Sequence, residues 1–148
     1  MARQEQRQRQ PERDYGHRSV VDKLGIKPGH AVAFEACPVS VPEDLRQQAL
    51  ERAGRAAADA SEPVDVVLVG ADDTTDAHKV LSAWRPRIDQ AGGIWVLTPK
   101  RGQPGYVDQR ELILAGPDAG LVDNKICSID ERTSALRFVI RKVDRIYS

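Results

Sequence analysis

The sequence lacks any apolar run long enough to cross a membrane. A transmembrane helix needs about 20 consecutive apolar residues, and the N-terminal residues are instead polar and rich in arginine and glutamine. They match neither a signal peptide nor a membrane anchor. We therefore expect a cytoplasmic protein with no membrane partner.

Cysteine is scarce, and an excess of either charge is absent. The two cysteines, Cys37 and Cys127, and the three histidines do not have the spacing of a metal site, so we predict reduced thiols and no metal. Lysine plus arginine number 22, as do aspartate plus glutamate, so the formal net charge is zero. A neutral chain lacks the electrostatic attraction that draws basic proteins to nucleic acid.

Motifs of common catalytic sites are also missing. The chain has no phosphate-binding GxxxxGK loop, no nucleophile elbow and no Ser-His-Asp order. We therefore assign no catalytic residue, and whether the protein is an enzyme stays open, with a non-catalytic role favoured.

The chain divides into a tail and one domain. Residues 1–19 contain five arginines and almost nothing that could be buried, so we predict a disordered tail. This tail is either simply solvated or a short basic arm, through which any contact with nucleic acid would be weak. Residues 20–148 have a suitable length for one α/β domain.

Apolar strand patterns alternate with helical patterns along this domain. Because parallel strands covered on both faces have near-continuous apolar sequences, three segments indicate a parallel sheet. Two final strands joined by a polar turn indicate a closing antiparallel hairpin. We thus predict a small Rossmann-like three-layer sandwich with about five strands. The expected strands are 31–35, 64–69, 94–98, 121–129 and 135–143. The expected helices are 20–27, a helix capped by Ser40 with Pro42 in its first turn that runs to about Asp59, 74–90 and 108–115. We expect Gly92 and Gly93 to end the third helix and Gly116 and Pro117 to interrupt the last.

This order of elements resembles the core of a class I methyltransferase. The segments LGIKPGHAVAFEACP, PVDVVLVGADD and AWRPRIDQAGGIWVLTPK resemble its first strand, its fourth strand and the helix leading into its fifth strand. AGLVDNKICSIDERTSALRFVIRK resembles the closing hairpin. More closely, GIKPGH, DVVLV, GGIWVLTPK and GLVDNKICSIDE are similar to a bacterial family known as domain of unknown function 3052. The resemblance implies a fold and no assigned activity.

The sequence departs from methyltransferases where the cofactor would bind. After the first strand such enzymes need glycine-rich backbone, whereas residues 35–39 read EACPV. They also need an acidic residue at the end of a second strand, which holds the ribose hydroxyls. Here only one helix and short links are expected between Phe34 and Val64, so two strands are absent. We therefore predict that the protein binds no cofactor, neither S-adenosylmethionine nor NAD.

Ligands of open α/β sheets bind at the carboxyl ends of the strands. The polar residues expected at that edge form a candidate ligand rim, consisting of Glu35, Cys37, Asp72, Asp73, Lys100 and Arg101. The alternative interpretation is that these are ordinary polar loop residues, with Asp73 or Thr74 capping a helix. Cys37 would need a base to act as a nucleophile, and His78 is the nearest candidate.

Two functions remain open from the sequence. The first is a non-catalytic binding or regulatory module on a degenerate methyltransferase-like fold. Its partner would be a protein, with a second copy of this chain as one candidate. The alternative is a small enzyme or ligand-binding protein that takes a small anionic metabolite at the candidate rim.

Overall fold

Helices and strands alternate along the chain up to a final hairpin. The computed structural model describes residues 16–145. The elements are α2 (Gly16–Lys23), β1 (Val32–Cys37), α3 (Glu43–Ala53), β2 (Val64–Ala71), α4 (Ala77–Trp84), β3 (Ile88–Pro99), α5 (Gln109–Asp118), β4 (Leu121–Ser128), β5 (Thr133–Ile140) and the 3-10 turn η1 (Lys142–Asp144).

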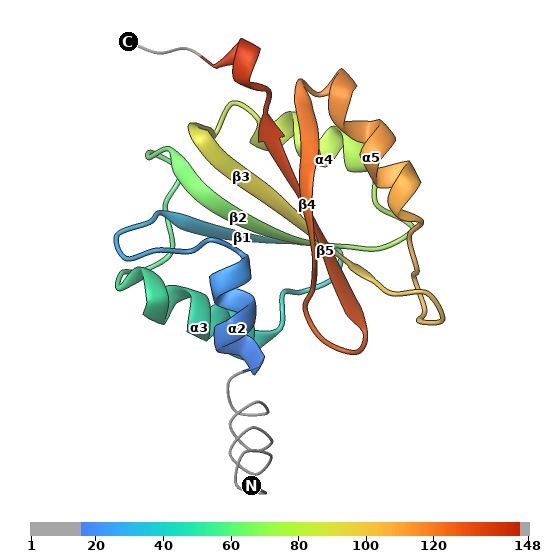
Figure 1. Cartoon of the computed structure of the whole chain (residues 1–148), viewed down its shortest axis with the longest axis horizontal. Coiled ribbons are helices and arrows are strands. Elements are labelled where there is room, and N and C mark those ends of the chain that lie inside the picture. Colours follow the sequence, from blue (N-terminus) through green and yellow to red (C-terminus); the bar gives the residue numbers. More distant parts are fainter. Residues whose placement is uncertain (1–15, 146–148) are drawn as a thin grey trace, which may run out of the picture.

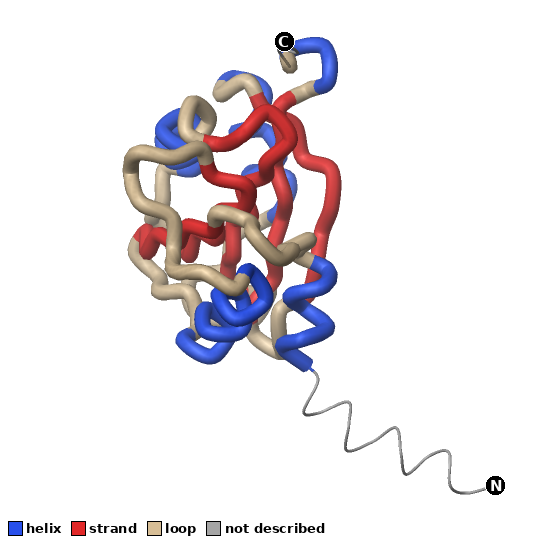
Figure 2. The backbone as a smooth tube through the Cα atoms, turned by 90° about the vertical axis from the view of Figure 1, so that its left-hand side faces the viewer, coloured by secondary structure: helices blue, strands red, loops and turns tan. Residues whose placement is uncertain are grey.

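The five strands form one sheet in the order β1-β2-β3-β5-β4. β1, β2 and β3 are parallel, and β5 runs antiparallel to both β3 and β4. Helices α2 and α3 cover one face, and α4 and α5 cover the other (Figure 1). Figure 2 shows the sheet from the side, with helices on either side of the strands. The predicted Rossmann-like α/β fold with an antiparallel hairpin is confirmed.

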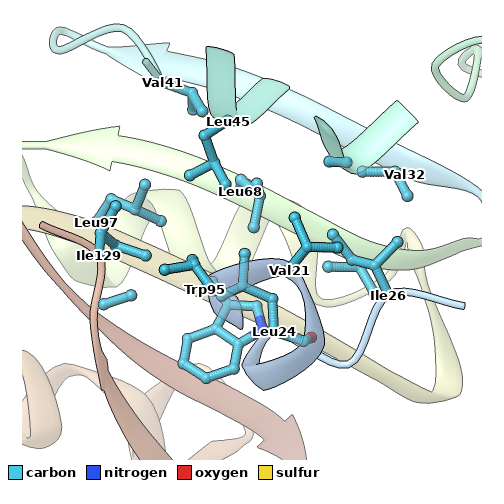
Figure 3. Close-up of a cluster of buried hydrophobic side chains, with 14 of the residues drawn as sticks. Val21, Leu24, Ile26, Val32, Val41, Leu45, Leu68, Trp95, Leu97 and Ile129 are labelled. Carbon is cyan, nitrogen blue, oxygen red and sulfur yellow. Dashed lines mark hydrogen bonds between the residues drawn. The ribbon is translucent and has the colours of Figure 1, made fainter. Parts of the chain in front are cut away.

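Trp95 of β3 anchors the face that α2 and α3 cover. Its side chain is 1% exposed, and its indole N–H donates to the carbonyl oxygen of Leu24 at 3.0 Å. Figure 3 shows the ring beside Val21 and Leu24, with Leu45 of α3 farther along the same cluster. Because the buried ring needs a partner for its N–H, the carbonyl of Leu24 must lie beside it. This contact holds the end of α2 against the sheet.

The opposite face carries a second apolar cluster. Trp84 of α4 and Leu112 of α5 pack there against Ile94 and Phe138 of the sheet. Neighbouring residues of β3, such as Ile94 and Trp95, therefore face opposite clusters, and both are buried. This two-sided burial explains why the central strands have no alternation of apolar and polar residues.

The limits of α3 differ from the expected ones. The residue before the helix is Pro42, and no side chain caps it, so Ser40 does not act as the predicted cap. The helix ends at Ala53, well before Asp59, because Gly54 adopts the left-handed conformation with φ 72°. Its N–H then bonds to the carbonyl of Leu50 at 2.8 Å, which closes the last turn.

The expected helix over 74–90 was wrong at both ends. Asp76, not Asp73 or Thr74, caps α4 by accepting the N–H of Lys79 at 3.1 Å. The helix stops at Trp84, just before Pro86, and β3 already begins at Ile88. Gly92 lies within β3, and a Cβ at this position would be only 2.8 Å from the carbonyl oxygen of Val64. The glycine thus permits close approach to β2 and does not end a helix.

The first and the last helix also differ from the expected ones. α2 begins at Gly16, within the expected tail and before the expected start at Val20, and residues 1–15 lie outside the described part. α5 continues to Asp118, so Gly116 and Pro117 form its last turn and do not interrupt it. Within residues 16–145, no helix combines the length and the apolar character that crossing a membrane requires.

Candidate functional site

The chain leaving β1 folds back over the end of β2. Pro38 forms an isolated antiparallel bridge with Ala71. A Cβ at Gly70 would overlap the carbonyl oxygen of Val39 and would lie 2.8 Å from its carbonyl carbon. Glycine is therefore the residue that this contact needs. The hydroxyl of Thr75 also donates to the carbonyl of Cys37, so residues 37–39 are held against the end of β2.

Glu35 and Cys37 interact with each other and with α4. A carboxylate oxygen of Glu35 accepts the indole N–H of Trp84 at 2.5 Å. Burial raises the pKa of the Cys37 thiol, and a hydrogen bond to Glu35 and the charge of that carboxylate raise it further. Because the thiolate is the reactive form, Cys37 is a poor nucleophile at neutral pH.

The proposed base, His78, faces a different set of neighbours. It lies in the first turn of α4, where its Nε2 is 3.5 Å from the hydroxyl oxygen of Ser82. In the described part of the chain no hydrogen bond joins His78 to Cys37. The two residues therefore do not form a nucleophile–base pair in this structure.

Asp72 and Asp73 form a tight turn after β2. The carboxylate of Asp72 accepts the hydroxyl of Thr74 at 2.6 Å and its N–H at 2.8 Å. These bonds lower the pKa of Asp72, the hydroxyl bond most. The N–H of Asp73 donates to the carbonyl of Gly105 at 3.1 Å, which joins this turn to the loop after β3.

Lys100 and Arg101 have other partners. The ammonium group of Lys100 donates to the hydroxyl of Ser128 and to the carbonyl of Asp130, both at 2.6 Å, and so braces the β4–β5 turn. The guanidinium carbon of Arg101 lies 5.0 Å from the centre of the Tyr106 ring. Neither side chain forms an ion pair with the Asp72–Asp73 turn.

The six residues of the candidate rim therefore do not converge on one pocket. Asp72 and Asp73 line a cavity of about 540 Å³ between α4 and α5. Glu35 lines a separate shallow hollow with Arg46 and Arg87. The cavity that Asp72 and Asp73 share is thus the candidate functional site.

This cavity has an apolar floor and an acidic rim. Among its lining residues are five carboxylates and no lysine or arginine. The acidic residues are Asp72, Asp73, Asp76, Asp108 and Glu111, and the other residues are Ala71, Thr75, Ala77, His78, Val80, Val96, Tyr106, Val107, Leu112 and Ala115.

Three of the acidic residues were missed from the sequence. Asp76 and Asp108 are the residues that cap α4 and α5, and Glu111 lies in the first turn of α5. Their signal was present, because helices that follow parallel strands begin at the edge where those strands end. Within the described residues, no group of three His, Cys, Asp or Glu side chains is arranged to hold a metal ion.

The comparisons with known proteins decide the family. A family profile described as "Protein of unknown function (DUF3052)" matches residues 21–142. The chain belongs to this family. An uncharacterized protein of Mycobacterium tuberculosis and one of Mycobacterium bovis are each 35% identical to the DUF3052 chain over 106 residues. The match covers 68% of this chain and 65%, slightly less than two thirds, of each relative.

Solved structures similar to the DUF3052 chain include methyltransferases. A SAM-dependent methyltransferase from Aquifex aeolicus gives a TM-score of 0.58 at 14% identity, covering 88% of this chain and 94% of that one. A TehB-like SAM-dependent methyltransferase from Corynebacterium glutamicum gives 0.54 at 11% identity, covering 86% and 88%. At such low identity the likeness establishes only that the DUF3052 chain has a methyltransferase-like fold.

The contact at Gly70 can be tested by adding one methyl group. In Gly70→Ala the new Cβ overlaps backbone atoms of Val39, so we expect a loss of about 3 kcal/mol of unfolding free energy. Urea denaturation, monitored by circular dichroism, measures this loss of unfolding free energy. Gly25→Ala is the matched control, because Gly25 has φ 76° and nothing within 4 Å of an added Cβ. It should lose only about 1 kcal/mol, and an equal loss in both variants would contradict the close contact.

The raised pKa of Cys37 predicts slow alkylation. At neutral pH the thiolate fraction should be smaller than in a free cysteine, so iodoacetamide should react slowly and faster as the pH rises. Glu35→Gln removes the charge that raises the pKa and should accelerate the reaction. Peptide mass spectrometry follows Cys37 separately from Cys127. Glu131→Gln, on the exposed hairpin turn, should change nothing; an unchanged rate in Glu35→Gln would argue against the Glu35 contact.

Proposed function

We propose that this protein is a non-catalytic binding module on a degenerate methyltransferase-like fold. The observation that carries the proposal is the packing of residues 37–39 on Gly70. A nucleotide cofactor needs open, glycine-rich backbone with free N–H groups after the first strand. In this chain the backbone after β1 packs on Gly70 and Ala71 of β2. In addition, Pro38 has no N–H to donate.

The position of β1 supports the same conclusion. β1 is the outermost strand of the sheet and pairs only with β2 among the described strands. The acidic residue that holds the ribose in the resembled methyltransferases follows a strand on the other side of the first strand. In the described part of this chain no strand lies there, so an adenosine group would have no wall to bind against.

The arrangement of polar groups favours binding over catalysis. The Cys37 thiol has a raised pKa, and it is not paired with His78. Lys100 is engaged with the β4–β5 turn and does not face the Asp72–Asp73 turn. The small anionic metabolite of the alternative hypothesis would meet five carboxylates in the α4–α5 cavity, and these would repel its negative charge.

The absence of nucleotide binding is tested by calorimetry. Titration of the full chain with S-adenosylmethionine, S-adenosylhomocysteine and NAD should give no binding heat. S-adenosylhomocysteine is the decisive ligand because it has the nucleoside of the cofactor without its sulfonium charge. Micromolar affinity for S-adenosylhomocysteine or NAD would refute the proposed function.

The edge of β1 that faces away from β2 is only partly covered, and this supports the protein partner in the proposal. On that side the N–H of Ala58 donates to the carbonyl of Val32 at 2.8 Å, and no described strand continues the sheet beyond it. Unpaired strand edges can accept a strand from another chain. For a second copy of the chain, β1 pairing with β1 would extend one sheet through both molecules.

Light scattering after size-exclusion chromatography tests the second copy as the partner. We expect the mass to rise from 16.4 kDa toward twice that value as the concentration increases. Ala36→Pro, a change within this edge strand, should shift the equilibrium toward the monomer. A mass that stays at one chain at all soluble concentrations would exclude the second copy.

A further inference from the structure

The α4–α5 cavity is large enough for a small organic ligand. Its volume of about 540 Å³ lies within the range of about 300–1,000 Å³ that is common for small-molecule sites. Figure 1 shows the two helices that flank it, on the face of the sheet opposite α2 and α3. Apolar residues from the sheet and from both helices line its inner part, including Ala71, Val80, Val96, Leu112 and Ala115. A hydrocarbon portion of a ligand would be buried there.

Two carboxylates of the rim are available to a ligand. The side chains of Asp73 and Glu111 accept no hydrogen bond within the described residues, whereas Asp72 accepts from Thr74 and Asp76 from Lys79. Asp108 is paired with Arg110 at 3.1 Å. Asp73 follows β2 and Glu111 lies on α5, so the two free charges come from different walls of the cavity.

The distribution of these charges favours an organic cation over a metal ion. A metal ion needs several ligands around one point, and no such group of three exists among the described residues. Carboxylates on separate walls fit instead a ligand whose positive groups are separated by a hydrocarbon chain. Tyr106 adds an aromatic ring to the rim.

We propose that the α4–α5 cavity binds a small aliphatic diamine or polyamine, with its ammonium groups at Asp73 and Glu111 and its methylene chain on the apolar floor. This inference rests on the proposed function of a binding module and names the ligand class. Asp73 and Glu111 supply the charges from two different elements, and the apolar lining residues supply contact for the methylene chain. No covalent step is involved.

Titration of the full chain with putrescine and spermidine tests this proposal. Both amines should bind, spermidine more tightly because it carries one more charge, and both should bind more weakly at high salt. Two control ligands isolate the charge: 1,4-butanediol has the length of putrescine without its charge, and citrate has the opposite charge. Neither should bind. Failure of both amines to bind, or equal binding of the diol, would overturn the proposal.

Two substitutions locate the binding site. Asp73→Asn and Glu111→Gln each remove one charge at a side chain that holds no other described group, so the fold should persist. Each should weaken spermidine binding about two- to fivefold, as expected for a solvent-accessible ion pair. The double variant should weaken it about tenfold. Glu131→Gln removes a charge on the distant hairpin turn and is the matched control; an equal effect there would show only general attraction to acidic surface.

The outcomes for this cavity and for the proposed function are separable. S-adenosylmethionine is itself a cation, so weak binding that disappears in the double variant would belong to the cavity. Binding of S-adenosylhomocysteine that survives in the double variant would instead refute the proposed function. A lysine-containing peptide that binds while free amines do not would assign the cavity to a protein partner and overturn the small-amine proposal.

Discussion

The contact between Gly70 and the carbonyl of Val39 determines how the edge of the sheet at the carboxyl ends of β1 and β2 is built. Only a residue without a Cβ lets the chain leaving β1 lie directly on the end of β2. Once there, the segment is held by the bridge from Pro38 to Ala71 and by the hydroxyl of Thr75 on the Cys37 carbonyl. The same Thr75 belongs to the turn that leads into α4. The start of that helix, and with it one wall of the cavity, therefore depends on the packing at Gly70.

The central strands and the hairpin could be predicted because burial on both faces leaves a strong sequence signal. Helix limits could not, because they depend on contacts distant in the sequence. Gly92 and Gly93 resemble a helix stop in the sequence, yet Gly92 allows β3 to approach the carbonyl of Val64. Ser40 is a good capping residue, but it belongs to the segment that crosses over β2, and the helix begins after Pro42. In each case tertiary packing overrides a valid local preference.

For the candidate rim, the sequence predicts the positions of the loops but not the directions of their side chains. Topology predicts which loops meet at the carboxyl edge, and the loops after β1, β2 and β3 do lie at that edge. It does not predict where a long side chain points. Lys100 extends to the β4–β5 turn, and Glu35 turns toward Trp84, because each finds a hydrogen-bond partner there. Short aspartates have less reach, which is why Asp72 and Asp73 remain where the loop places them.

A net charge of zero also conceals an uneven distribution of charged residues. The cavity lining contains five carboxylates although the whole chain is neutral. Arg101 and Arg110 are not lining residues, but each contacts one, Arg101 the ring of Tyr106 and Arg110 the carboxylate of Asp108. Clefts lined by charges of one sign focus the electrostatic potential. The overall composition predicts no general attraction to nucleic acid, but it could not predict this acidic cavity. The methyltransferase-like sheet thus carries, on the face under α4 and α5, a cavity whose acidic lining the overall charge does not reveal.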